Sequence, residues 1–297
     1  MTAPVFRDFA QEELDRQYFL RGAVADCETF FADYAARSAA TRDRLQNVSD
    51  CRYGPGPKET LNVFPAAPDD DAAFPAGGTA PVHVFIHGGY WQAMDKSDFD
   101  YIADGFVSQG ACFVNLNYDL APDVSVEEIL HQTQRALIWV WQNISAYGGD
   151  PDRIHVSGHS AGGHLTAMLA ATDWNALGAD LPENLVKSGL PVSGVFELEP
   201  IRLSFMNDVL QLSPAMVERI SPDLHVADIS CPMTFCVGGD ETPEFIRQQA
   251  DYVQAMQELG QSPIVVPAPG LHHFSVINTL SERGSDLNSA AIAQMCE

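Results

Sequence analysis

The sequence predicts an α/β protein whose mostly parallel central sheet is covered by helices on both faces. Two observations lead to this prediction. Short apolar runs bounded by Gly and Pro are expected to form strands, and segments with helical spacing alternate with them along the chain. The runs are apolar throughout, as in strands that are buried on both faces of a sheet. In such sheets the active site lies beyond the carboxyl ends of the strands.

The N-terminal segment, residues 1–50, is expected to be helical and to contribute to a cap. Its apolar side chains, including Phe30, Phe31 and Tyr34, recur at helical spacing. A run of Gly and Pro at 53–57 then breaks the chain. The Pro-, Gly- and Asp-rich stretch 65–81 is predicted to be a surface loop.

The predicted strands and helices follow in alternation. The strands are expected at 61–64, 82–86, 111–116, 154–157, 190–195, 233–237 and 264–266. The helices after the N-terminal segment are expected at 98–109, 126–147, 161–171, 243–259 and 275–280. The irregular residues 196–226 are predicted to form a small helical cap that contains Phe205, Met206, Leu210 and Met216. A single domain is expected over 1–297.

Composition restricts the partners and the compartment. The chain has 16 Lys and Arg against 40 Asp and Glu, a net charge of −24, which disfavours nucleic acid and anionic membranes as partners. Its six cysteines form no CxxC pair and no zinc-ligand spacing, as expected for free thiols in a reducing compartment. Residues 1–21 show no apolar core of a secretion signal, and no apolar run is long enough to span a membrane. A cytoplasmic protein without a metal site is expected, and a homodimer is among the expected assemblies.

A candidate nucleophile lies at the end of the predicted strand 154–157. The segment Gly158 to Gly162 matches G-x-S-x-G with Ser160 at its centre, and a predicted helix follows at once. This strand–turn–helix setting is the one that a nucleophile elbow requires, and the tight turn needs the small neighbours found here. An ordinary Gly-rich turn is the alternative interpretation.

A second glycine motif follows the predicted strand 82–86. His87-Gly88-Gly89 matches the loop that supplies backbone N–H groups to an oxyanion hole, for which we expect donors from Gly88, Gly89 and Ala161. His87 itself is expected to anchor the loop. The next two side chains, Tyr90 and Trp91, are predicted to form an aromatic wall against the substrate, with packing beneath the loop as the alternative for one of them.

The base and the acid should follow the serine in the order acid, then histidine. His273 follows the last predicted strand and precedes the last predicted helix, so it is favoured over His272. The acid should follow strand 233–237, where Asp240 and Glu241 are adjacent. Periodicity does not separate these two carboxylates, and either could hold the imidazole in the required tautomer.

These motifs together resemble the kynurenine formamidase (arylformamidase) family and its bacterial esterase relatives. The shared segments are HGGYWQ from His87, GHSAG from Gly158, TPEFIRQ from Thr242, LDRQY from Leu14, Tyr53-Gly54 and His273-Phe274. The resemblance implies an α/β-hydrolase fold that needs no cofactor, with Ser160 as nucleophile and His273 as base. In the family the acid immediately precedes the TPEF-type segment, so the resemblance implies Glu241 as the acid and leaves Asp240 as the runner-up.

The resemblance further implies hydrolysis of N-formyl-kynurenine or a related small N-formyl amide through an acyl-enzyme. A carboxylesterase acting on short-chain acyl esters, or a hydrolase of another small amide, is the first alternative. A non-catalytic ligand-binding protein with the same fold is the second alternative, since a fold does not by itself fix a function. The complete set of nucleophile, base, acid and oxyanion glycines favours an enzyme.

Overall fold

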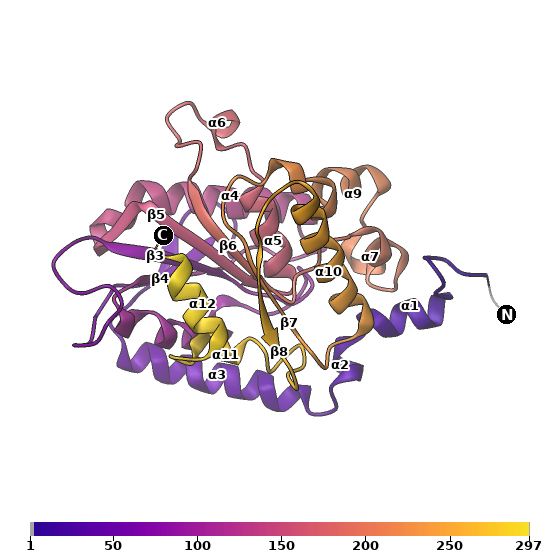
Figure 1. Cartoon of the computed structure of the whole chain (residues 1–297), viewed down its shortest axis with the longest axis horizontal. Coiled ribbons are helices and arrows are strands. Elements are labelled where there is room, and N and C mark those ends of the chain that lie inside the picture. Colours follow the sequence, from indigo (N-terminus) through magenta and orange to yellow (C-terminus); the bar gives the residue numbers. More distant parts are fainter. Residues whose placement is uncertain (1–2, 297) are drawn as a thin grey trace.

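The strands form one eight-stranded sheet in the computed structural model, which describes residues 3–296 (Figure 1). Residues 1, 2 and 297, at the two ends of the predicted domain, lie outside the described residues. The strand order is β1-β2-β4-β3-β5-β6-β7-β8, with antiparallel pairing of β2 to β1 and to β4 and parallel pairing elsewhere. The bounds are β1 Val48–Arg52, β2 Thr60–Phe64, β3 Ala80–Ile86, β4 Cys112–Leu116, β5 Gly149–His159, β6 Val186–Val192, β7 Thr234–Gly238 and β8 Ile264–Ala268.

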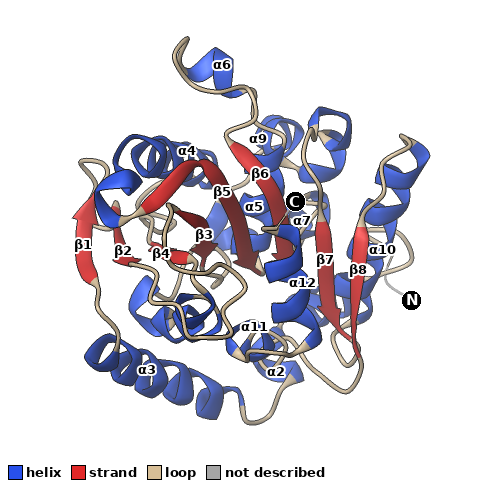
Figure 2. Ribbon diagram, turned by 60° about the vertical axis from the view of Figure 1, so that its left-hand side comes forward, coloured by secondary structure: helices blue, strands red, loops and turns tan. Residues whose placement is uncertain are grey.

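Helices cover both faces of this sheet, which confirms the predicted fold class (Figure 2). Side chains alternate along β3, so Val84 packs into a core with α4 and α5, whereas Phe85 packs into a second core with α3, α11 and α12. The longer helices are α1 Gln11–Tyr18, α3 Cys27–Arg44, α4 Val126–Asn143, α5 Ala161–Ala170, α9 Pro214–Ile220, α10 Pro243–Glu258 and α12 Asp286–Gln294. The shortest are α2 Leu20–Ala23, α6 Trp174–Leu177, α7 Glu199–Leu203, α8 Asn207–Leu210 and α11 Asn278–Ser281.

The prediction of an α-helix at 98–109 is wrong. The segment forms three 3₁₀ turns, Lys96–Asp98, Asp100–Gly105 and Val107–Gln109. Contacts with residues distant in the sequence determine the conformation of this segment. The Asp100 side chain is drawn into the sheet, and the Gly105 backbone lies so close to α11 that an added Cβ would come within 2.4 Å of the Leu280 carbonyl oxygen.

Strand β1 and helices α6 and α12 were not predicted, and the helix predicted at 275–280 is shorter than expected. Strand β1 pairs only with β2 at the sheet edge and is mostly exposed, so it carries no apolar alternation. Helix α12 follows the predicted helix 275–280, which itself starts only at Asn278. Polar and apolar residues of α12 are buried alike, including Asn288 and Gln294, which removes the amphipathic signal.

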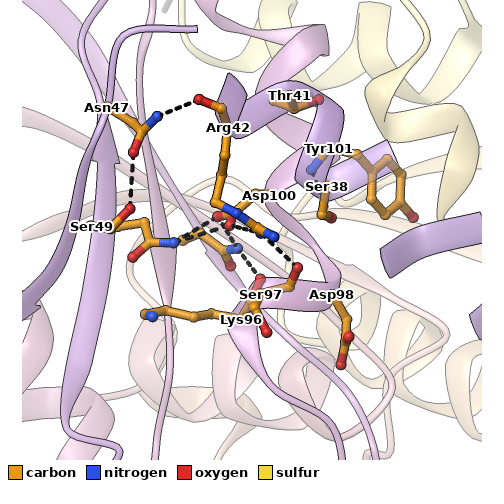
Figure 3. Close-up of polar contacts among 12 residues, drawn as sticks. Ser38, Thr41, Arg42, Asn47, Ser49, Lys96, Ser97, Asp98, Asp100 and Tyr101 are labelled. Atoms are coloured by element: carbon orange, nitrogen blue, oxygen red, sulfur yellow. Dashed lines mark hydrogen bonds and ion pairs between the residues drawn. The ribbon is translucent and has the colours of Figure 1, made fainter. Parts of the chain in front are cut away.

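A buried carboxylate fastens α3 to the sheet (Figure 3). Asp100 is fully buried and accepts hydrogen bonds from Arg42 of α3 at 2.6 Å, from Asn62 of β2 at 3.0 Å and from Asn115 of β4 at 2.8 Å. Such a charge is tolerated in the interior because it is paired and fully hydrogen-bonded. The network therefore fixes the helix that carries Phe31 and Tyr34.

The predicted cap, residues 196–226, contains α7, α8 and α9 between β6 and β7. The N-terminal segment packs against it. Gln11 donates to the Leu203 carbonyl at 2.9 Å, and the Phe205 N–H donates to Asp15 at 2.8 Å. No helix within residues 3–296 combines the length and the apolar character needed to cross a membrane.

Candidate active site

Ser160 occupies a strained turn between β5 and α5. Its backbone has φ 57° and ψ −116°, a conformation that L-residues rarely adopt, and its N–H donates to the Val192 carbonyl at 2.9 Å. Backbone strain of this kind persists only where the surrounding structure enforces it, and it is typical of functional sites. The turn exposes the side chain to a pocket beyond the carboxyl end of the sheet.

The glycines of the elbow allow close approach of main chains. A Cβ on Gly158 would lie 2.1 Å from the Gly162 carbonyl oxygen, and one on Gly162 would lie 2.0 Å from the Ile86 carbonyl oxygen. Neither contact is sterically possible. The small residues around Ser160 are therefore required by packing, as the motif predicts.

His273 and Glu241 form a buried pair near the serine. His273 Nδ1 lies 2.6 Å from Glu241 Oε2, and both side chains are almost completely shielded from solvent. The other carboxylate oxygen, Oε1, accepts from the Gly238 N–H at 2.8 Å and from the Ser193 hydroxyl at 2.5 Å. The carboxylate thus holds the Nδ1–H tautomer of His273, which leaves Nε2 free to accept a proton.

The two residues that the sequence left as alternatives lie elsewhere. Asp240 is exposed, and its own N–H donates to the Leu271 carbonyl at 3.0 Å. His272 does not line the pocket that contains Ser160 and His273, and its Nδ1 accepts from the N–H groups of Phe274 and Ser275 at 3.2 and 3.3 Å. The structure therefore places Glu241, rather than Asp240, against His273.

The loop after β3 is held rigidly by its own histidine. His87 is fully buried, with its Nδ1 2.7 Å from the Gly88 carbonyl and its Nε2 3.0 Å from the side chain of Asn117. Its ring stacks on Tyr118 at 4.3 Å, and the Tyr118 hydroxyl donates to the His87 carbonyl at 2.9 Å. Burial lowers the pKa of His87 to about 4. These contacts agree with an anchoring role for His87.

The loop brings free N–H groups to the elbow. A Cβ on Gly88 would lie 3.0 Å from Ser160 Cβ, and Gly89 has φ 104°, a left-handed conformation that favours glycine. Within the described part of the chain, no hydrogen bond from the N–H groups of Gly88, Gly89 or Ala161 to a protein acceptor is found. These three N–H groups therefore have no protein partner in the described residues, and Gly89 lines the cavity described below.

Ser160 and His273 both line one cavity of about 200 Å³. Its walls come from α3, from the α1–α2 region, from the loop after β3 and from the cap, and they are mainly aromatic or apolar. Apart from the catalytic candidates, the lining side chains include Tyr18, Phe19, Leu20, Arg21, Phe31, Tyr34, Tyr90, Met94, Phe99, Phe205, Met206 and Phe274. Two predicted cap regions, 1–50 and 196–226, thus both contribute to the pocket.

Of the two residues predicted to form an aromatic wall, Tyr90 lines the cavity and Trp91 does not. Tyr90 lines the cavity and donates its hydroxyl to the Tyr18 carbonyl at 3.0 Å. Burial, together with the nearby charge of Glu241, raises the pKa of Tyr90 well above its ordinary value. Trp91 is fully buried beneath the loop, edge-on to His164 at a centroid distance of 5.0 Å, because positive φ angles at both positions turn the chain.

Two residues that the sequence did not single out contact the buried pair. Ser193 follows β6 with φ 49° and donates to Glu241. His159 precedes Ser160 and lies 2.9 Å from the His273 carbonyl. The position before the nucleophile is variable in the motif, and β6 carries no motif at all, so local patterns gave no signal for either role. Residues 3–296 contain no cluster of His, Cys, Asp or Glu placed to hold a metal ion.

The fold and the site define this chain as an α/β-hydrolase of the serine-hydrolase type, an enzyme that acts on ester or amide bonds. Its similarity to known hydrolases supports this class. Residues 72–255 match the family model BD-FAE. Kynurenine formamidase of Danio rerio is 31% identical over 83% of this chain and 82% of its own, and that of Salmo salar is 28% identical over 98% of both. Esterase LipQ of Mycobacterium tuberculosis is 30% identical over 80% of this chain and 59% of its own.

Solved structures share the architecture. The crystal structure of a candidate thioesterase from a Silicibacter species has a TM-score of 0.80 and 29% identity, covering 95% of this chain and 99% of its own. Esterase B of Lactobacillus rhamnosis has a TM-score of 0.68 and 21% identity, covering 93% of this chain and 96% of its own. The chain belongs to the BD-FAE family of α/β-hydrolases, and the resemblance to kynurenine formamidases is confirmed.

Proposed function

We propose that the chain hydrolyses a small N-formyl amide, as its kynurenine formamidase relatives are named for doing, with Ser160 as nucleophile, His273 as base and Glu241 as acid. The single observation that carries the proposal is the 2.6 Å contact of His273 Nδ1 with Glu241 beside a pocket that Ser160 also lines. A buried carboxylate, an imidazole and a strained serine in one pocket suit nucleophilic acyl transfer.

The reaction proceeds in two steps. His273 Nε2 accepts the Ser160 hydroxyl proton while Oγ attacks the formyl carbon, and Glu241 stabilises the imidazolium that forms. The imidazolium gives its proton to the leaving nitrogen as the C–N bond breaks, which leaves a formyl ester on Ser160. Water, deprotonated by His273, then attacks this ester and releases formate, and the proton returns to Ser160.

The free N–H groups of Gly88, Gly89 and Ala161 are the proposed donors to the oxyanion. Each donor aimed at the developing charge contributes about 3–4 kcal/mol to the stability of the transition state. The N-terminus of α5 lies beside Ser160 and adds a favourable dipole. This arrangement needs no side-chain cation near the reacting carbonyl.

The lining of the pocket supports an aromatic leaving group. Aromatic side chains surround the cavity, so an aryl ring can stack there and bury its apolar area. Tyr90 is the proposed substrate contact beside the elbow, since its ring lines the cavity and its hydroxyl is already bonded to Tyr18. The formyl group is the smallest acyl group, which suits the close approach of Gly88 to the Ser160 side chain.

A carboxylesterase for short acyl esters is the second candidate. It is favoured by the apolar pocket and by the similarity to esterase LipQ. The same residues would serve it, because both reactions pass through an acyl-enzyme on Ser160 and differ only in the acyl group and in the leaving atom, nitrogen or oxygen. A cytoplasmic location and a homodimer remain predictions from the sequence.

The test compares hydrolysis of N-formyl-kynurenine with that of p-nitrophenyl acetate by the wild type, Ser160→Ala and the control Ser289→Ala, whose serine is exposed on α12. We expect efficient formamide cleavage that is lost in Ser160→Ala and kept in Ser289→Ala. Slow formamide cleavage beside Ser160-dependent ester cleavage would favour the esterase. Activity on both substrates that survives Ser160→Ala would refute the mechanism.

A further inference from the structure

The ring of His159 lies between three parts of the candidate site. Its backbone belongs to the end of β5 and leads directly into Ser160. A Cβ on Gly88 would lie 3.3 Å from His159 Nδ1, so the ring lies beside the oxyanion loop. On its other side the ring packs against His273, with centroids 4.6 Å apart and planes inclined by 42°.

A hydrogen bond joins His159 to the main chain of the base. His159 Nε2 lies 2.9 Å from the carbonyl oxygen of His273. Because a carbonyl oxygen can only accept, Nε2 must carry the hydrogen, and this fixes the tautomer of His159. Only 4% of the residue is exposed, so water does not compete for this hydrogen bond.

We propose that His159 is a positioning residue that holds the backbone of His273 in register with Ser160. The inference rests on the proposed function, since it assigns a role relative to the proposed base and nucleophile. The His273 ring is held at Nδ1 by Glu241 and packs against Phe245 and Phe274, but these contacts act on the side chain and not on its main chain. The hydrogen bond from His159 to the His273 carbonyl fixes the main chain from which this ring projects.

The neighbouring turn is anchored in the same way from the other side. The Tyr34 hydroxyl of α3 donates to the carbonyl of Phe274, the residue after the base. His159 of the elbow thus donates to the carbonyl of His273, and Tyr34 of the N-terminal segment donates to the next carbonyl, that of Phe274. Of these two residues, only His159 is adjacent to Ser160 in the sequence. Its hydrogen bond therefore links the backbone at Ser160 directly to the backbone of His273.

A neutral ring is needed at this position. His273 becomes positively charged in the transition state, and a second cation 4.6 Å away would oppose that charge. Burial and the proximity of His273 lower the pKa of His159 well below its ordinary value. The ring therefore donates its hydrogen bond without adding charge.

The proposal is tested with His159→Leu, His159→Gln and the matched control His164→Leu. A glutamine can place its Nε2 hydrogen near the position of the histidine Nε2–H, whereas leucine cannot donate. His164 is an equally buried histidine in α5 whose Nε2 lies 2.7 Å from the Ile220 carbonyl, but it does not line the pocket. Steady-state kinetics on p-nitrophenyl acetate are normalised to active sites titrated with a p-nitrophenyl phosphonate, and thermal unfolding is recorded for each variant.

We expect kcat of His159→Leu to fall about 10- to 100-fold with KM changed less than about 3-fold, since the lost hydrogen bond orients the base. His159→Gln should keep kcat within about 3-fold of the wild type. His164→Leu should lower the unfolding temperature without lowering kcat per active site. Wild-type kcat in His159→Leu, equal losses in His159→Gln and His159→Leu, or an equal loss in His164→Leu would each overturn the proposal. Full activity in Ser160→Ala would instead show that the proposed function itself is wrong.

Discussion

Replacing Glu241 by Gln should abolish most activity because it forces the wrong tautomer on His273. Oε1 accepts from the Gly238 backbone N–H at 2.8 Å, a donor that cannot reverse its role. The glutamine oxygen must therefore occupy the Oε1 position, which places its NH₂ group against His273 Nδ1. His273 Nδ1 then has to accept a hydrogen bond from the glutamine NH₂ group. The imidazole proton therefore moves to Nε2, and the imidazole can no longer take the proton of Ser160.

The magnitude follows from what is lost. A wrong tautomer together with the lost carboxylate charge lowers kcat about 10⁴-fold in the general serine triad, which corresponds to about 5 kcal/mol of transition-state stabilisation. The pocket and the oxyanion donors are unchanged, so KM should change by less than about 3-fold. The assay is steady-state hydrolysis of p-nitrophenyl acetate, with far-ultraviolet circular dichroism to confirm folding.

Asp240→Asn is the matched control, because it makes the same acid-to-amide change one residue away at an exposed position. We expect this variant to retain kcat within about 2-fold, as is usual for a surface substitution without specific contacts. A large loss in Asp240→Asn together with an active Glu241→Gln would refute the reasoning and return the runner-up to the role of acid.

Three further outcomes are expected. Gly88→Ala should lower kcat more than about 10-fold, because its Cβ would lie 2.9 Å from the His159 carbonyl oxygen and displace the elbow. The control Gly78→Ala, whose Cβ would have no atom within 4 Å, should leave kcat unchanged in the same assay. Arg42→Ala should lower the free energy of unfolding in urea by about 3 kcal/mol, since it leaves Asp100 buried and unpaired; a loss below about 1 kcal/mol would contradict the importance of this network. Stability should also fall as pH is lowered from 7 to 5, because buried histidines have folded pKa values of about 4, below the unfolded value, so the unfolded chain binds more protons. The histidines concerned are His87, His155 and His164. Each should lower the free energy of unfolding by about 2 kcal/mol at most, as measured by urea titration at the two pH values. An unchanged free energy of unfolding would contradict this expectation.

Local sequence patterns predicted the elements that are buried and regular. Strands β3, β4 and β7 are short, mostly apolar runs, and their burial on both faces gave each of them a clear signal, whereas β8 is apolar but largely exposed at the sheet edge. The elbow at Ser160 and the glycine loop at Gly88 were also predictable, since each needs small residues at fixed spacing within the chain. The misassigned segments, β1 and the 3₁₀ turns after Lys96, take their form from contacts with distant residues.

The candidate site divides along the same line. The sequence by itself predicted the candidate nucleophile Ser160, the glycines and the choice of His273, because each is tied to its own strand end. Only the tertiary structure decided which of Asp240 and Glu241 contacts His273, since this depends on which side chain turns inward beneath the Gly238 N–H. It also decided where Tyr90, Trp91 and His159 lie, because contacts between strand ends far apart in sequence are made by folding and leave no local pattern.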